Sequence, residues 1–293
     1  MSDMYGLKLS KYYDVIHKDK DYITECELIL KNSNSKNSLL DIGCGTANHS
    51  IILSKYFNKV VGIDLSEEMI DEAKRKILKF NIDNLFLNKS SLKDENNKFD
   101  TVISMFNVVN HIHSLSELIE FFSNVSLKLK EDGVFIFDCW NGTACRIEKP
   151  IEKTQKEIIH DWYSISIKNQ TETNLLKSTS KMLTSVLVFS ENEKVDEFSY
   201  DITHKLWTPD ILQSACEMNG IEVYKIIKNY NEDILAKDTD HRVTFICRKP
   251  NKMDKNTSES SNFIYESPDN GKTIYARKIG NSPYNRVKIE KNI

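Results

Sequence analysis

Short apolar segments alternate with amphipathic segments in the first half of the chain, and this alternation most constrains the fold. We predict strands at the short apolar runs and helices where apolar residues recur at helical spacing. The predicted order is a helix at 21–30, strand 38–42, helix 47–56, strand 59–64, helix 67–80, strand 85–87, strand 101–105, helix 115–129 and strand 133–139. Strands that alternate with helices form βαβ units, so we expect a doubly wound α/β fold with a mostly parallel, seven-stranded sheet.

The pattern changes after Lys149. Three later segments read as extended strands separated by polar turns: 157–167, 181–189 and 195–206. We interpret them as an antiparallel β insertion at about 150–207. The elements that would complete the main sheet are a helix at 210–218 and strands at 222–228 and 242–248. The predicted organisation is therefore a domain at 1–250, a polar linker at 251–262, and a C-terminal hairpin or tail of unassigned role at 263–293.

The composition excludes several classes of protein. A formal net charge of −3 over 293 residues creates no field that would collect nucleic acid. The N-terminus lacks an apolar signal segment, and no stretch approaches the roughly 20 apolar residues that cross a bilayer. The six cysteines form no CxxC pair, which favours buried, reduced thiols over a zinc site or a disulfide framework. We expect a cytoplasmic monomer or homodimer without metal or membrane contact.

A glycine-containing turn follows the first predicted strand, in the sequence SLLDIGCGTANHS. Gly43 and Gly45 would let the backbone approach a ligand at the carboxyl end of the strand, where open α/β sheets bind their ligands. A dinucleotide site has a similar signature. However, the third glycine of that signature is replaced by Asn48, and Asp41 would repel a pyrophosphate. The turn therefore favours a ligand that carries positive charge.

Several motifs together resemble those of class I S-adenosylmethionine-dependent methyltransferases. The turn 41–46 (DIGCGT) resembles their first motif, KFDTVISMFNVVNHI their fourth-strand motif, and LKEDGVFIFDCWN the turn into their fifth strand. The details are most similar to the small-molecule group that includes sugar N,N-dimethyltransferases of macrolide deoxysugar pathways. This resemblance implies a Rossmann-like methyltransferase fold and S-adenosyl-L-methionine as the cofactor.

The resemblance also implies a cofactor site. Its expected residues are Tyr13, Tyr22, Asp41, Gly43, Cys44, Gly45, His49, Asp64, Leu65, Met69, Ser90, Ser91, Met105 and Phe106. Asp64 ends the second strand, where its carboxylate would accept both ribose hydroxyls. Two positions depart from the family: Ala47 stands where a third glycine is usual, and Ser90 or Ser91 where an acid usually meets the adenine amine.

Methyl transfer is an in-line displacement, so the protein must mainly hold the nucleophile close to the methyl group. An amine acceptor must be unprotonated, and a nearby base would help. His111 and His113, just after the fourth strand, are the candidates for this base, and we predict His111 as the catalytic residue. Further candidates for the acceptor pocket are Trp140, Asn141 and Trp207.

The sequence leads to one preferred function and two alternatives. We expect methylation of an amine, or of a hydroxyl, on a small polar metabolite, with a nucleotide-linked sugar as one candidate. The first alternative is an O-methyltransferase acting on a carboxylate or phenol. The second is a non-catalytic cofactor-binding module recruited through residues 263–293.

Overall fold

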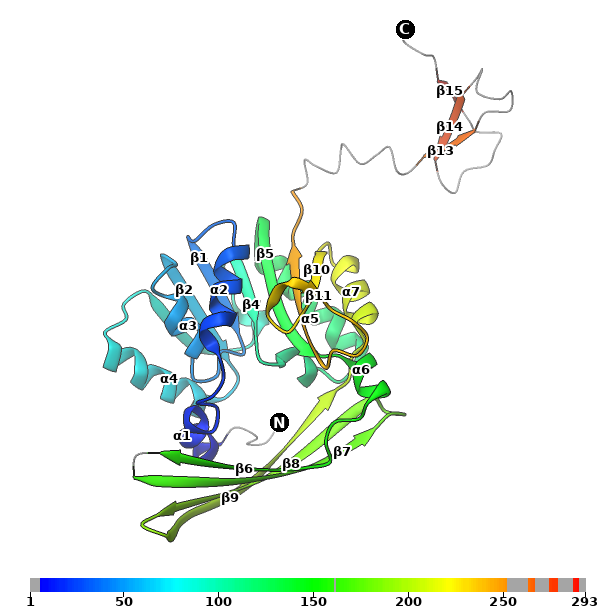
Figure 1. Cartoon of the computed structure of the whole chain (residues 1–293). Coiled ribbons are helices and arrows are strands. Elements are labelled where there is room, and N and C mark those ends of the chain that lie inside the picture. The colour runs from blue at the N-terminus through cyan, green and yellow to red at the C-terminus, as the bar shows by residue number, and fades with distance from the viewer. Residues whose placement is uncertain (1–5, 161, 252–262, 267–273, 279–286, 290–293) are drawn as a thin grey trace. The chain divides into compact units, whose positions relative to one another are not determined.

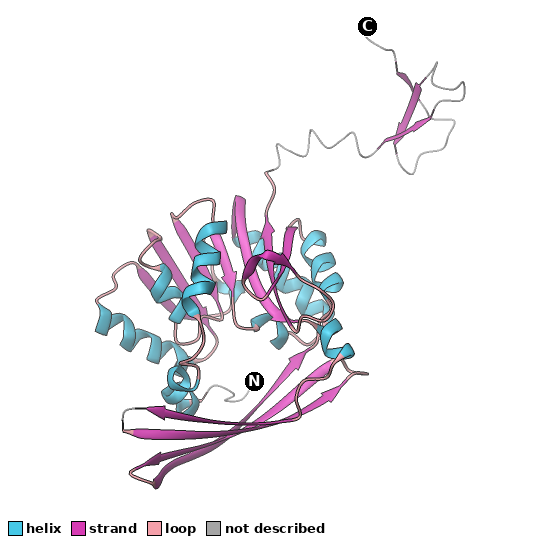
Figure 2. Cartoon of the chain, viewed as in Figure 1, coloured by secondary structure: helices cyan, strands magenta, loops and turns pink. Residues whose placement is uncertain are grey.

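A computed structural model describes residues 6–160, 162–251, 263–266, 274–278 and 287–289. The chain divides into two compact units, Met1–Lys249 and Pro250–Ile293. In the first unit, helices cover both faces of a central sheet (Figures 1 and 2).

The main sheet has eight strands in the order β11-β10-β12-β5-β4-β1-β2-β3. Their bounds are β1 Ser38–Ile42, β2 Lys59–Asp64, β3 Leu85–Lys89, β4 Phe99–Ser104, β5 Leu129–Trp140, β10 Glu222–Lys228, β11 Asn231–Leu235 and β12 Arg242–Arg248. Strands β3, β2, β1, β4 and β5 are parallel, whereas β12, β10 and β11 each run antiparallel to their neighbours. This confirms the predicted doubly wound fold. The strand that we did not predict is β11, whose mixed sequence NEDIL carries little apolar signal.

The helices and 3-10 turns connect these strands. Their bounds are α1 Leu7–Ile16, α2 Tyr22–Asn32, α3 Asn48–Leu53, α4 Glu67–Phe80, η1 Leu92–Asp94, η2 Val108–His111, α5 Leu115–Lys128, α6 Gly142–Ile147 and α7 Pro209–Met218. Helix α4 matches its prediction, and the Ser66 side chain caps it by accepting a hydrogen bond from the Met69 N–H. Helix α3 begins one residue later than predicted, because Ala47 is in the left-handed region with φ +62°.

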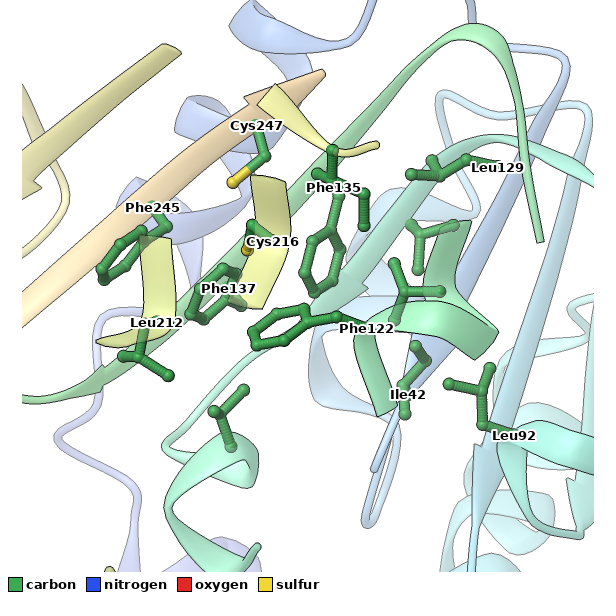
Figure 3. Close-up of a cluster of buried hydrophobic side chains, with 14 of the residues drawn as sticks. Ile42, Leu92, Phe122, Leu129, Phe135, Phe137, Leu212, Cys216, Phe245 and Cys247 are labelled. Carbon is green, nitrogen blue, oxygen red and sulfur yellow. The ribbon is translucent and has the colours of Figure 1, made fainter. Parts of the chain in front are cut away.

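Each face of the sheet buries its own core. Residues of α5 and α7 pack on one face, while α2, α3 and α4 pack on the other. In the first core, the rings of Phe135, Phe137 and Phe245 stack across β5 and β12, with centroid separations of 5.0 and 4.6 Å (Figure 3). The six cysteine side chains are buried, as expected. These two cores hold the carboxyl ends of the central strands at one edge.

A separate antiparallel sheet is inserted between α6 and α7. Its strands follow the order β6-β7-β8-β9, with bounds Lys153–His160, Tyr163–Asn174, Thr179–Ser190 and Glu193–Lys205. The predicted insertion is thus confirmed, although the segment 157–167 proves to be the end of β6 and the start of β7. The sheet spans from α1 to α6 beneath the main sheet (Figure 1). One face packs on α1 through a shared apolar cluster.

The second unit contains β13 Phe263–Glu266, β14 Ile274–Lys278 and β15 Val287–Ile289 in an antiparallel sheet. The turn of the predicted C-terminal hairpin and most of the predicted linker lie outside the described residues. Within the described parts of the chain, no helix is long and apolar enough to span a membrane.

Candidate active site

A cavity of about 610 Å³ lies at the carboxyl ends of β1, β2 and β4. Strand β1 pairs with both β2 and β4, so the cavity occupies the point where the strand order reverses, the usual ligand site of such sheets. Its volume lies in the range of small-molecule sites. The predicted site residues that line it are Tyr13, Gly43, Gly45, Asp64, Leu65, Met69, Ser90, Ser91, Met105, Phe106 and His111.

The glycine turn forms one wall of the cavity. Gly43 and Gly45 have φ values of +71° and +54°, a region that glycine enters without strain. A Cβ on Gly43 would lie 2.7 Å from Val108 Cγ2, so no side chain fits there. A Cβ on Gly45 would meet no protein atom within 4 Å, because the residue borders open cavity space. The backbone at Gly45 is therefore exposed to a ligand.

The Asp64 carboxylate lines the cavity next to the glycine turn. One oxygen accepts a hydrogen bond from the Gly45 N–H at 2.8 Å, and the other accepts from the Ser66 N–H at 2.9 Å. Burial raises the pKa of Asp64, and these backbone donors oppose the shift. Each carboxylate oxygen can accept more than one hydrogen bond. Asp64 thus shapes the turn and still offers acceptor capacity toward the cavity.

Ser90 and Ser91 stand where the family usually has an acid. Both line the cavity. The Ser91 hydroxyl donates to Asp94 Oδ2 at 2.6 Å and caps η1. Its oxygen can still accept a hydrogen bond, so the position remains suited to an amine donor.

Two residues predicted to contact the cofactor, Asp41 and Cys44, point elsewhere. Side chains alternate along β1, and Asp41 faces α3, where it accepts a hydrogen bond from Ser50 Oγ at 2.6 Å. The Cys44 side chain fills the space above Gly62, where an added Cβ would lie 3.0 Å from its sulfur. Neither residue lines the cavity, so we correct their role to supporting the turn.

Tyr22 and His49 also lie outside the cavity lining. His49 Nε2 is 2.6 Å from Glu25 Oε2, and its ring meets the Tyr22 ring edge at 5.0 Å. Lys20 forms an ion pair with the other oxygen of Glu25. This buried network holds α3 against α2. The His49 imidazole extends from α3 toward Glu25 of α2, and therefore not toward the ligand.

Sequence reasoning missed Asp14, which supports the glycine turn from outside the cavity lining. It accepts hydrogen bonds from Thr46 Oγ1 at 2.6 Å and from Asn48 Nδ2 at 2.9 Å, and it pairs with Lys76 Nζ at 2.8 Å. Helix α1 is thereby tied to the glycine turn and to α4. The motif YYD contains the residue, but its partners lie 32 to 62 positions away along the chain.

A strained turn presents Phe106 to the cavity. Phe106 and Asn107 have φ values of +67° and +65°, which cost about 1 to 3 kcal/mol each in residues with side chains. The Asn107 N–H donates to Asp138 Oδ1 at 2.9 Å, and the Tyr230 hydroxyl donates to the other Asp138 oxygen. The sequence contains one indication of this contact: Asp138 lies inside the apolar run GVFIFDCW, and a buried aspartate needs hydrogen-bond donors.

His111, the last residue of η2, also lines the cavity. Burial lowers the pKa of its imidazole to about 4, and His113 adds to the shift. At neutral pH the ring is uncharged and presents one donor and one acceptor nitrogen. Of the other acceptor-pocket candidates, Trp140, Asn141 and Trp207 do not line the cavity. Trp207 instead donates to the Ile112 carbonyl at 2.9 Å and supports the segment that carries His111.

Residues 39–133 match the family described as methyltransferase domain. These residues form a methyltransferase domain, with the motifs and the Rossmann-like fold of the class I S-adenosylmethionine-dependent methyltransferases. The cofactor of this methyltransferase domain is S-adenosylmethionine. The glycine turn without side-chain bulk, the carboxylate of Asp64 and the cavity volume are all compatible with that ligand.

Individual proteins resemble the methyltransferase over parts of their length. An uncharacterized protein of Methanocaldococcus jannaschii is 39% identical over 46% of this chain and 49% of its own length. The dTDP-3-amino-3,4,6-trideoxy-alpha-D-glucopyranose N,N-dimethyltransferase of Streptomyces venezuelae is 28% identical over 47% of this chain and 59% of its own. The chain thus spans about half the length of the curated relatives it matches.

The fold extends further than these sequence matches. The S-adenosylmethionine-bound structure of an amino pentose methyltransferase from Micromonospora echinaspora superposes with a TM-score of 0.66 at 18% identity. It covers 85% of this chain and 99% of that one. Most of the chain therefore shares its architecture with a protein of that fold.

Gly45 and Gly220 are a matched pair of positions for testing whether the cofactor approaches the backbone of the glycine turn. Both have positive φ, and an added Cβ meets no protein atom within 4 Å at either position. We expect Gly45→Ala and Gly220→Ala to lower the free energy of unfolding equally, by about 1 kcal/mol. Only Gly45→Ala should weaken S-adenosylmethionine binding, by about tenfold or more, in a calorimetric titration. Equal affinity in both variants would contradict a close approach of the cofactor at Gly45.

Buried histidines near the cavity make stability depend on pH. Burial lowers the pKa of His204 to about 3 and that of His17 to about 4, as for His111. Between pH 6.5 and 4 these histidines bind protons in the unfolded chain but stay neutral in the folded chain. The free energy of unfolding therefore falls as the pH falls. His204→Phe should reduce this slope by about 1.4 kcal/mol per pH unit in urea titrations. An unchanged slope would contradict the prediction, and above pH 6.5 no difference in slope is expected.

Proposed function

We propose that this chain transfers a methyl group from S-adenosylmethionine to an amine of a small, polar metabolite, of which a nucleotide-linked amino sugar is the leading candidate. The observation that carries the proposal is that one cavity is lined by the glycine turn, by Asp64 and by His111. A cofactor held by the first two would direct its other end toward the third.

The cofactor supplies an activated methyl group on a cationic sulfonium. The residues of the chain have to bind it, exclude water and orient the acceptor. Asp64 would accept the ribose hydroxyls, and the backbone at Gly43 and Gly45 would border the methionine moiety. Phe106 would contribute an aromatic surface near the cation, which is favourable through its ring quadrupole.

His111 would act on the acceptor. With a pKa of about 4 it stays neutral, so it adds no positive charge beside the sulfonium. Such an imidazole is a weak base, and we propose that it accepts a hydrogen bond from the amine N–H and orients the nitrogen lone pair toward the methyl group. A desolvated site of this kind favours the unprotonated amine over the ammonium ion.

The choice of a sugar acceptor rests on similarity alone. Relatives from Streptomyces venezuelae and Streptomyces fradiae have names that describe dTDP-amino-sugar N,N-dimethyltransferases. Because acceptor sites vary on a shared scaffold, we treat these compounds as probes.

The test is a panel of acceptors incubated with the full chain and S-adenosylmethionine. It would contain dTDP-3-amino-3,6-dideoxyglucose, free amino sugars, phenols and carboxylates, with products identified by mass spectrometry. We expect methylated amines, and about tenfold lower turnover in His111→Ala, the effect of one lost orienting hydrogen bond. Methylation of phenols or carboxylates alone, undiminished in His111→Ala, would contradict the amine assignment and favour O-methylation.

A further inference from the structure

The last strand of the inserted sheet, β9, meets the segment of the main domain that carries His111. Three consecutive residues of β9 make the contact. The Thr203 carbonyl lies 3.0 Å from His113 Nε2, and the Lys205 carbonyl accepts from Asn110 Nδ2 at 2.7 Å. Between them, the His204 ring lies against the His111 ring with a centroid distance of 5.2 Å and an interplanar angle of 60°.

The backbone around His111 is fixed independently of His204. Asn110 Oδ1 accepts from the Trp140 N–H at 2.9 Å, and the Ile112 carbonyl accepts from Trp207. These contacts set where η2 lies. The His204 ring is the β9 side chain that contacts it face to edge.

His204 is itself held firmly. It is 7% exposed, it lies opposite Ser180 in the register of β8 and β9, and its ring meets Trp140 at a centroid distance of 5.3 Å. The ring does not line the cavity. Any effect of His204 on an acceptor would therefore act through His111.

We propose that His204 is a positioning residue that fixes the ring orientation of His111, so that the inserted sheet controls how His111 meets the acceptor N–H. The proposal rests on the function proposed above. An unconstrained His111 ring could rotate about its side-chain bonds and present carbon instead of nitrogen to the amine. The edge-to-face contact restricts that rotation. The ring then loses its conformational entropy when the chain folds, and not when the acceptor binds.

Histidine also suits this position chemically. Burial lowers the pKa of both rings, so the pair is neutral at neutral pH. A lysine or arginine in place of His204 would put positive charge near the sulfonium. A neutral imidazole provides a flat, polar ring without that charge.

The test compares wild type with His204→Phe, which keeps an aromatic ring but removes both nitrogens. His241→Phe is the matched control, since His241 is a partly exposed histidine whose ring contacts the Glu148 carbonyl. The first readout needs no acceptor: 15N NMR of the imidazole nitrogens in the presence of S-adenosylmethionine, with the His111 signals assigned from His111→Ala.

We expect His204→Phe to shift the His111 nitrogen signals and His241→Phe to leave them unchanged. Cofactor affinity should stay within about twofold in both variants, because neither residue lines the cavity. Unmoved His111 signals in His204→Phe, or equal shifts in both variants, would overturn the proposal. If His204→Phe does not fold, His204→Gln is measured by the same criteria.

The second readout separates this inference from the proposed function. With dTDP-3-amino-3,6-dideoxyglucose as the probe, kcat should fall about tenfold in His204→Phe while KM for S-adenosylmethionine is unchanged. If wild type does not methylate the probe, the proposed acceptor is wrong, and the NMR result alone decides on His204. A shifted His111 signal with unchanged kcat would overturn the positioning role.

Discussion

Asp64→Ala is expected to weaken S-adenosylmethionine binding by about two to three orders of magnitude, or about 3 to 4 kcal/mol. The carboxylate borders the cavity beside the glycine turn, where it can accept both ribose hydroxyls, and hydrogen bonds to charged groups contribute about 1.5 to 3 kcal/mol each. The variant also loses the contacts to the Gly45 and Ser66 N–H groups, which hold the turn in shape. Calorimetric titration of the full chain measures the dissociation constant.

A cofactor analogue without the ribose 2′-hydroxyl distinguishes the two contributions. Wild type should bind the analogue more weakly than S-adenosylmethionine, whereas Asp64→Ala should bind both equally. The control is Asp83→Ala, which removes an exposed aspartate outside the cavity. If Asp64→Ala binds as tightly as Asp83→Ala, Asp64 does not hold the ribose.

Glu25→Ala is expected to lower the free energy of unfolding by about 3 to 5 kcal/mol. The Glu25 carboxylate lies between Lys20 and His49, and the three side chains are only 3 to 8% exposed. Burial alone would raise the pKa of Glu25, but His49 and Lys20 hold it below its ordinary value. Without the carboxylate, the buried Lys20 ammonium has lost its counter-ion.

Glu27→Ala is the matched control, because Glu27 is an exposed glutamate on the same helix. It should change stability by less than about 0.5 kcal/mol in urea denaturation. Replacing Lys20, Glu25 and His49 together by apolar residues of similar size should restore much of the loss, since no unpaired charge remains. A loss below about 1 kcal/mol in Glu25→Ala would contradict the role of the network.

The parts of the fold that depend on local sequence were predictable. Strands β1 and β2 and helix α4 have the predicted bounds, because their apolar period and the Ser66 cap are contained within a few residues. The glycine turn and Asp64 could be placed at a ligand site for the same reason, since strand ends and turns meet at one edge of a parallel sheet.

The direction of individual side chains was less predictable. Asp41 was expected to reach the cofactor because it precedes the turn, yet the alternation of β1 directs it to Ser50. The sequence shows Ala47 where the family usually has glycine, but it does not show which backbone conformation this alanine adopts. Ala47 is fully buried with φ +62°, so a methyl group occupies a conformation that usually favours glycine.

Contacts between distant segments could not be predicted. Tyr230 reaches Asp138 because β11 turns back along the edge of the sheet, and NEDIL gave no strand signal. His204 reaches His111 across 93 residues, through the register of an inserted sheet whose first predicted strand spans the end of β6 and the start of β7. Such contacts follow from tertiary packing, which a local pattern does not encode.

The central claim is that the cavity beside the glycine turn binds S-adenosylmethionine. Separate calorimetric titrations of the full chain with S-adenosylmethionine and with NAD test it most directly. We expect S-adenosylmethionine to bind at a single site with a dissociation constant of about micromolar order, and NAD to give no heat at the same concentration. Tight binding of NAD, without binding of S-adenosylmethionine, would contradict the account.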